Sequence, residues 1–259
     1  MDYALPPLIA LLVWWLGTGV VMLLDGLPRG TFRWSLGLSS LIACGALVCI
    51  RHSAHDASTA GAYAAFSCAV LVWGWHELAF LTGWLTGPRK DACSQPGHGP
   101  TRFNEAVQAI LWHELAIIAM GVLIVALSWG GSNQVAVWTF TLLWVMRLSA
   151  KFNLFLGVRN VGEEFLPPHL LYMGSYFRRR RMNPLLPWSV LVSGVVAVLL
   201  IAAAIRADAA QRTGLLLVAS MLVFALLEHL LMVLPMQPSV LWRWALRSPS
   251  VSSPAVTAP

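Results

Sequence analysis

Seven long apolar runs determine what this chain can fold into. Most of them reach the roughly 20 residues that an α-helix needs to cross the hydrocarbon core of a bilayer. Because backbone polar groups inside lipid must be satisfied within the protein, the sequence predicts an all-α, polytopic transmembrane helix bundle. The second run is short, so six spans is the main alternative to seven. The predicted spans are Ala4–Leu24, Trp34–Ile50, Ala60–Leu85, Glu105–Ser128, Gln134–Leu156, Leu185–Ile205 and Thr213–Leu234.

The composition agrees with a membrane protein. Of the 259 residues, 58% are hydrophobic and only 11% are charged, whereas a soluble domain carries about 25% charged residues. The 13 tryptophans suit the aromatic belts at the two bilayer interfaces. No positively charged segment precedes the first run, so we expect a retained span and not a cleaved signal peptide. We expect one transmembrane domain over residues 1–247 and a disordered tail over residues 248–259.

The positions of Lys and Arg predict the orientation of the bundle. With seven spans, three of these residues lie on the side of the N-terminus, namely Arg51, Arg206 and Arg212. Twelve lie on the other side, which is therefore expected to be cytoplasmic. The N-terminus is then periplasmic and the C-terminus cytoplasmic, and the net charge of +6 reflects this orientation, with no nucleic-acid partner. The twelve are Arg29, Arg33, Arg89, Lys90, Arg102, Arg159, Arg178, Arg179, Arg180, Arg181, Arg243 and Arg247.

The longest loop, about residues 157–184, belongs to the predicted cytoplasmic side. It contains an amphipathic stretch at His169–Phe177, followed by four consecutive arginines, Arg178–Arg181. We expect a surface helix in this stretch that lies at the level of the lipid headgroups and is held there by the arginines. Topological anchoring is the simplest role for the arginines, and docking of a partner protein is the alternative.

Three His/Glu pairs lie inside apolar runs, where ionisable side chains are costly and usually functional. The pentapeptide Trp75-His76-Glu77-Leu78-Ala79 recurs unchanged as residues 112–116, which contain His113 and Glu114, and the pair is reversed at Glu228-His229. At a rise of 1.5 Å per residue, the three glutamates lie roughly 9–14 Å from the cytoplasmic ends of their spans. The sequence therefore predicts that these residues share one depth.

Two basic residues of the fifth span, Arg147 and Lys151, fall in the same band. Four helices thus contribute ionisable groups to one polar layer in the cytoplasmic half of the bundle. Arg147 lies deep in its span, so we expect it to have an acidic partner. Lys151 lies closer to the helix end and is expected to extend its ammonium group towards the cytoplasmic surface.

Three interpretations of the polar layer stay open from the residues alone. The first is a charge-balanced network that holds the helices together. The second is a metal site such as a di-iron or di-manganese centre, because carboxylates and imidazoles are the ligands of such centres. The third is pigment binding, in which an imidazole provides an axial ligand to the magnesium of a chlorin or the iron of a haem. Zinc protease chemistry is not indicated, because the sequence has no HExxH motif.

Several motifs along most of the chain point to a family. They are Ala60–Tyr63, Trp73–Gly83, Thr86–Arg89, His113–Leu115, Trp138–Phe140, Arg147–Val158, Glu164–Pro167, Ser175–Arg179, Glu228-His229 and Leu234-Pro235. Together they resemble the PuhE family, the photosynthetic complex assembly proteins of purple and related phototrophic bacteria. The family has no established catalytic residues that could be transferred to this chain.

The resemblance implies an assembly factor for the bacterial photosynthetic apparatus, located in the inner (intracytoplasmic) membrane. Its role would concern bacteriochlorophyll supply or the assembly of the reaction centre and antenna. The implied partners are membrane lipids and either reaction-centre or antenna subunits or pigment-biosynthesis enzymes. The ligand of the polar layer stays open between a di-metal (iron) centre and a (bacterio)chlorophyll-type pigment.

The resemblance also narrows the candidate metal ligands, because family members often have an apolar residue at the position of His76. The remaining candidates are Glu77, His113, Glu114, Glu228 and His229. The alternative function is a metal-dependent membrane oxidoreductase or hydroxylase that acts on a tetrapyrrole or another lipophilic substrate. In that case Arg147 or Lys151 would bind a carboxylate of the substrate.

Overall fold

The computed structural model of the protein describes residues 3–94, 99–235, 242, 244 and 245. Within these residues, seven helices are long and apolar enough to cross a membrane, and the only β-pairing is an isolated bridge between Val158 and Arg179. The predicted all-α bundle with seven spans is therefore confirmed, and the chain is a multi-pass membrane protein. The helices are α1 (Leu5–Asp25), α2 (Phe32–Ser53), α3 (Thr59–Leu81), α4 (Pro100–Leu127), α5 (Val135–Leu156), α6 (Leu185–Arg206) and α7 (Ala209–Leu231).

Helices α2 and α7 extend beyond the predicted apolar runs at their N-terminal turns. The second helix extends beyond the short apolar run, and with the preceding 3-10 turn it is 25 residues long, enough to cross a bilayer. The last helix begins earlier than predicted because the Asp208 side chain caps it, accepting a hydrogen bond from the Gln211 N–H at 2.9 Å. Hydropathy alone misses such polar first turns.

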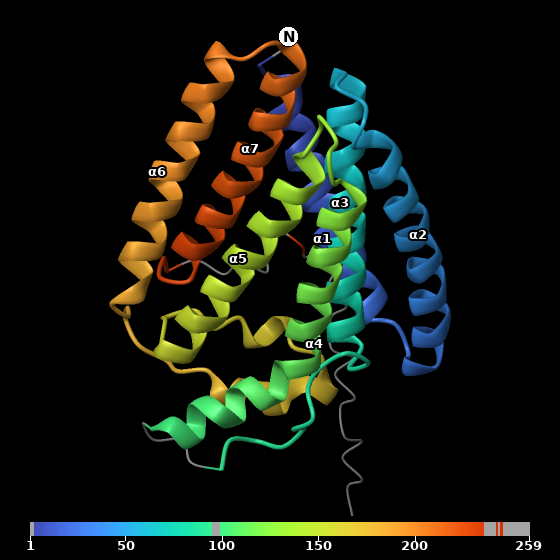
Figure 1. The fold of residues 1–259 in the computed structure, drawn as a ribbon. Coiled ribbons are helices and arrows are strands. Elements are labelled where there is room, and N and C mark those ends of the chain that lie inside the picture. Colours follow the sequence, from blue (N-terminus) through green and yellow to red (C-terminus); the bar gives the residue numbers. More distant parts are fainter. Residues whose placement is uncertain (1–2, 95–98, 236–241, 243, 246–259) are drawn as a thin grey trace, which may run out of the picture.

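Successive helices run in opposite directions, so the bundle has two distinct ends (Figure 1). The upper end in Figure 1 holds the start of α1 and the connections at residues 54–58, 128–134 and 207–208. The lower end holds the connections after α1, α3 and α5, including the arginine-rich segment. The two ends therefore contain the same connections that the count of Lys and Arg residues assumed. That the upper end is periplasmic and the lower end cytoplasmic stays a prediction.

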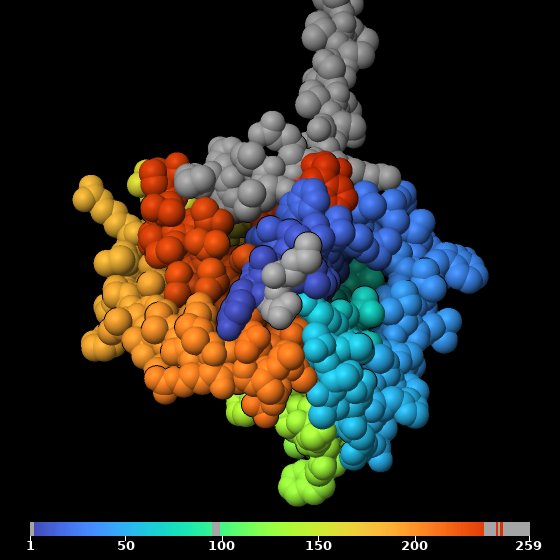
Figure 2. Space-filling view, turned by 90° about the horizontal axis from the view of Figure 1, so that it is seen from above, coloured from blue at the N-terminus to red at the C-terminus, as the bar shows by residue number. Residues whose placement is uncertain are grey.

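The helices α3 and α7 form the centre of the bundle. About half of the most apolar part of each is buried, against 11% for α1. Seen from the upper end, α6 and α7 lie on one side, α2 on the opposite side, and α1 between them (Figure 2). Large apolar side chains on the outer faces, such as Trp34, Leu41 and Trp188, are exposed and suit contact with lipid.

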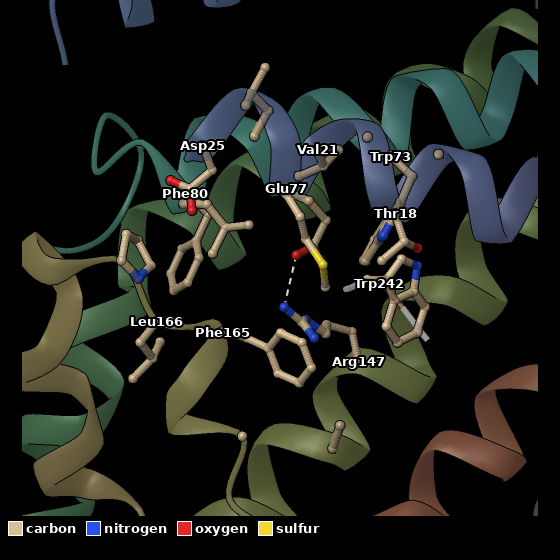
Figure 3. A pocket seen from close by; sticks show the side chains of 18 of the residues that line it. Thr18, Val21, Asp25, Trp73, Glu77, Phe80, Arg147, Phe165, Leu166 and Trp242 are labelled. Atoms are coloured by element: carbon tan, nitrogen blue, oxygen red, sulfur yellow. Dashed lines mark hydrogen bonds and ion pairs between the residues drawn. The ribbon is translucent and has the colours of Figure 1, made fainter. Parts of the chain in front are cut away.

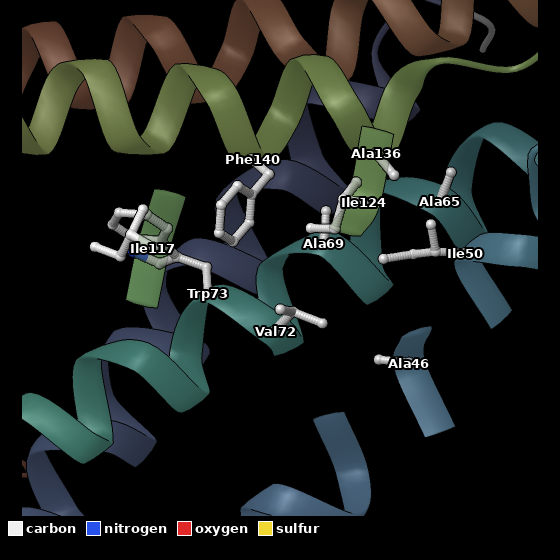
Figure 4. Close-up of a cluster of buried hydrophobic side chains, with 10 residues drawn as sticks. All are labelled: Ala46, Ile50, Ala65, Ala69, Val72, Trp73, Ile117, Ile124, Ala136 and Phe140. Carbon is white, nitrogen blue, oxygen red and sulfur yellow. The ribbon is translucent and has the colours of Figure 1, made fainter. Parts of the chain in front are cut away.

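Two apolar clusters hold the bundle together. In the first, side chains of α2, α3, α4 and α5 interlock, with the Trp73 and Phe140 rings edge to face at 5.6 Å (Figure 4). In the second, α1 packs against α3 and α7 through Phe66 and Leu217, and the Trp14 and Phe224 rings stack at 5.2 Å. The first and last spans are therefore direct neighbours.

The segment after α3 is inserted against α4 at the lower end. The His113 N–H donates to the Thr86 carbonyl at 2.9 Å, and a Cβ added to Gly87 would collide with backbone atoms of Gln108 and Ala109. A backbone group that enters the hydrogen-bond ladder of a helix bends it. The first turns of α4 accordingly run across the lower end before the helix turns upwards (Figure 1).

The long connection between α5 and α6 closes the lower end. Its amphipathic stretch forms a 3-10 helix, Pro168–Tyr176, whose Leu170 and Met173 side chains pack against Phe80 of α3. The apolar side of this segment therefore faces the bundle, and its position at the level of the lipid headgroups stays a prediction. The predicted disordered tail, residues 248–259, lies outside the described residues.

Candidate functional site

A cavity of about 1420 Å³ occupies the lower half of the bundle. It lies between α1, α3, α5 and α7, and the connection after α5 forms its lower wall. In Figure 3, Thr18 and Asp25 of α1 lie on one side of the cavity, and Arg147 and Phe165 lie on the opposite side. Most of the lining is apolar, so the few polar side chains in the wall determine what the cavity can bind.

The first polar feature is an ion pair that bridges the cavity. Arg147 Nη2 of α5 lies 2.8 Å from Glu77 Oε2 of α3. The predicted acidic partner of Arg147 is therefore confirmed. The Arg147 side chain is 40% exposed and Glu77 14%. The second Glu77 oxygen, Oε1, and the Arg147 Nε are buried without a hydrogen-bond partner among the described residues, so the pair keeps unused bonding capacity.

A second ion pair joins α4 and α5. Lys151 Nζ lies 2.5 Å from Glu114 Oε1, and the Trp144 indole donates to the other oxygen at 3.2 Å. The ammonium group also lies over the Phe80 ring, 5.6 Å from its centroid. The expectation that Lys151 extends to the cytoplasmic surface is therefore wrong: its charge is bound inside the bundle, and its side chain lines the cavity.

The reversed pair on α7 contributes an acid and a fully bonded imidazole. The Glu228 carboxylate lines the cavity and accepts a hydrogen bond from the Trp14 indole at 3.0 Å. Both ring nitrogens of His229 have partners, since Nε2 lies 2.9 Å from Ser149 Oγ and Nδ1 lies 2.8 Å from the Ala225 carbonyl. His229 therefore links α5 and α7 and has no nitrogen left for a ligand.

The two histidines of the repeated pentapeptide lie together, on the side of α3 that faces α4 and α5. Their ring centroids are 6.4 Å apart, and the exposed fractions of His76 and His113 are 0% and 1%. Phe80 and Phe140 pack against the rings at 4.6 and 5.9 Å. Neither nitrogen of His76, nor Nδ1 of His113, has a hydrogen-bond partner in the described part of the chain.

The structure does not bring the five predicted metal ligands into one cluster. Among the described residues, no group of three or more His, Cys, Asp or Glu side chains is placed to hold a metal ion. Two of the three carboxylates are bound to cations, so the arrangement does not fit a di-metal centre. The charge-balanced network is confirmed for two of its pairs, Glu77–Arg147 and Glu114–Lys151.

The structure adds cavity residues that the sequence analysis missed. Asp25, the last residue of α1, lines the cavity, and its Oδ1 is buried without a partner in the described residues. An acid that directly follows the apolar run of α1 was a usable signal. His169 also lines the cavity, and its Nε2 lies 2.8 Å from the Leu81 carbonyl. Burial lowers the pKa of His169, so the ring is neutral at neutral pH.

A polar network below the cavity fixes its lower wall. Arg89 Nε donates to the Tyr176 hydroxyl at 2.8 Å, and Arg89 pairs with Glu105 at 3.3 Å. The buried Arg102 donates to the Tyr176 and Phe155 carbonyls at 2.6 and 3.0 Å. The hydrogen bond that Arg89 donates to Tyr176 is the main cause that raises the pKa of Arg89, and burial raises the pKa of Tyr176. This network ties α4 to the wall that contains Tyr176.

Residues 1–253 match a family described as "Protein of unknown function (DUF3623)". The chain belongs to the DUF3623 family. This DUF3623 member is 40% identical, over 96% of its own length and 92% of the relative's, to a Rhodobacter capsulatus protein. That relative is described as "Uncharacterized 30.4 kDa protein in puhA 5'region". No solved structure matches. The position of the relative's gene in the puhA region is consistent with the predicted link to a phototrophic bacterium. Membership of this chain in the PuhE family stays a prediction.

Proposed function

We propose that this protein is an inner-membrane assembly factor for the bacterial photosynthetic apparatus and that it binds a (bacterio)chlorophyll-type pigment in the cavity. The observation that carries the proposal is one large apolar cavity with a polar band at its wall. The polar band consists of the two ion pairs Glu77–Arg147 and Glu114–Lys151. At about 1420 Å³ it exceeds the roughly 300–1,000 Å³ of common ligand sites. The relative encoded in the puhA region of a phototroph supports the photosynthetic context.

The polar band suits a flat macrocycle that carries carbonyl groups at its edge. The Arg147 guanidinium lines the cavity on a side chain that is 40% exposed, so its N–H groups can donate to a carbonyl or carboxylate oxygen. Lys151 supplies a second positive charge on the same wall. Aromatic side chains of the lining, among them Trp73 and Phe165, offer apolar faces to a ring. The chain's own contribution is to hold such a ring away from water and to fix its edge.

Pigment binding is tested on the protein purified in detergent from membranes that make bacteriochlorophyll. We expect a pigment absorbance band at about one pigment per chain, reduced in the Arg147→Met variant. Arg206→Met is the matched control, because Arg206 lies at the end of α6 next to the upper end, away from the cavity lining. A wild-type protein without pigment, both as purified and after incubation with bacteriochlorophyll, would contradict the proposal.

The assembly role is tested separately by crosslinking in intact membranes. We expect the protein to be joined to reaction-centre or antenna subunits or to pigment-biosynthesis enzymes. Recovery of neither class would remove the support for an assembly factor, whatever the cavity binds. Metal analysis of the same purified sample tests the enzyme alternative, which predicts a stoichiometric transition metal that is lost in Glu114→Ala.

A further inference from the structure

The cavity is not confined to the centre of the bundle, because its lining continues between α1 and α2. We call this outer part the α1–α2 groove. Val20 of α1, Ile42 of α2 and Leu71 of α3 line it and are about half exposed. All three belong to membrane-spanning segments, so the groove opens sideways, towards lipid. The lining residues that define it are Gly17, Val20, Ser39, Ile42, Leu71 and Gly74.

The groove contains real space beside α1. A Cβ built on Gly17 meets no heavy atom within 4 Å, and one built on Gly74 meets only a methyl group of Val21, at 4.0 Å. These two glycines therefore leave room along the facing surfaces of α1 and α3. The indole N–H of Trp75, the residue after Gly74, already donates to Ser40 Oγ at 2.8 Å. Its polar group is therefore satisfied within the protein.

The inner cavity and the groove differ in chemistry. The inner part contains the charged side chains of Glu77, Arg147 and Lys151. None of the groove residues carries an ionisable side chain. A continuous space that is polar at one end and apolar at the other matches an amphiphile, with its functional groups at the polar band and a long hydrocarbon chain along the groove.

We propose that the α1–α2 groove binds the hydrocarbon tail of the ligand in the cavity. This inference rests on the proposed pigment-binding function and narrows its ligand class to the esterified pigment that carries a long isoprenoid tail, in preference to the free-acid precursor that lacks it. The argument for this occupant is the continuity of the groove with the polar cavity. The lateral opening gives a membrane-soluble molecule direct access.

The test blocks the groove with one side chain and compares two ligands. Purified wild-type protein, Gly17→Leu and Gly45→Leu are titrated with bacteriochlorophyll and with bacteriochlorophyllide, and binding is followed by absorbance. Gly45 is the matched control: it is also a helical glycine whose added Cβ meets no heavy atom within 4 Å, and it does not line the cavity. Both variants are therefore expected to fold, which their helical circular dichroism checks.

We expect the wild type to bind the tailed pigment more tightly than the free acid. Gly17→Leu should weaken the tailed pigment about tenfold, the loss expected when roughly two methylene groups leave an apolar site. It should leave binding of the free acid unchanged, and Gly45→Leu should change neither. Ile42→Trp blocks the groove from α2 and provides the same test if Gly17→Leu does not fold.

Three results would overturn the inference, and they differ in what they leave standing. If Gly17→Leu weakens neither ligand, or weakens both equally, the groove does not bind the tail, and pigment binding in the cavity stands. If native mass spectrometry shows a phospholipid that Gly17→Leu displaces while pigment affinity is unchanged, a lipid occupies the groove. If the wild type binds neither pigment, the proposed pigment binding falls together with the inference, and the assembly role is left to the crosslinking test.

Discussion

Replacing Lys151 with Met should destabilise the bundle, because it removes the cation of a buried ion pair. The substitution leaves the Glu114 carboxylate inside the protein with only the Trp144 indole as a donor. Both side chains of the pair are more than four-fifths shielded, with exposures of 18% and 17%. Removing one partner of a buried ion pair costs about 3–5 kcal/mol, chiefly because the remaining charge stays buried.

The other ion pair of the polar band, Glu77–Arg147, provides an internal comparison. Arg147→Met leaves the Glu77 carboxylate, which is 14% exposed, without a hydrogen-bond donor among the described residues, so it should cost about the same 3–5 kcal/mol. The double variant Lys151→Met/Glu114→Leu removes both charges and should regain most of the stability, because no unpaired charge is left.

Thermal unfolding in detergent, followed by circular dichroism, measures these differences. For a chain of this size, 1 kcal/mol corresponds to about 2–4 °C in Tm, so Lys151→Met should lower the Tm by about 6–20 °C. A Tm equal to that of the wild type would refute the reasoning. So would a double variant as unstable as Lys151→Met alone, since the cost would then not come from the unpaired carboxylate.

Three further predictions concern other parts of the structure. Gly87→Ala should lower the stability by about 1–3 kcal/mol, since its Cβ meets the backbone of α4, while Gly45→Ala, in open space, should raise it by about 0.5–1 kcal/mol; equal Tm values would contradict this. Because burial lowers the pKa of His169, protonation favours the unfolded chain, so the stability of the wild type should fall as the pH drops below about 6.5. His169→Gln should show a shallower slope in the same unfolding titration. Trp14→Phe should cost about 1–3 kcal/mol by leaving the Glu228 carboxylate without its donor, and adding Glu228→Gln should recover part of the lost Tm.

The polar band was predictable in depth but not in its pairing. The fixed rise of a helix placed Glu77, Glu114, Arg147 and Lys151 at one level, and the structure brings them together as two ion pairs. The direction in which each side chain points depends on the rotation of its helix, which hydropathy does not determine. Adjacent residues point about 100° apart, so Glu77 faces the cavity while His76 faces α4. A metal cluster would have required the five predicted ligands to point towards one another.

The lower end shows the same limit for contacts between distant segments. The bend in α4 depends on the Thr86 carbonyl reaching the His113 N–H, and no local pattern in either segment indicates this approach. The predicted first span, Ala4–Leu24, ends one residue before Asp25, whereas the helix includes Asp25 and the residue lines the cavity. Sequence patterns predict the depth of each segment along the membrane normal. Side-chain packing determines which residues of different segments come into contact.

The contact between the first and last spans has a consequence for the timing of biosynthesis. One wall of the cavity joins α1 to α7 through the Trp14–Glu228 hydrogen bond, which connects residues 214 positions apart. A chain made from its N-terminus inserts α1 long before α7 exists. Until then the space between α1 and α5 is a trough open to lipid. The nascent protein therefore lacks this wall of the cavity, and a chain that stops after α6 never acquires it.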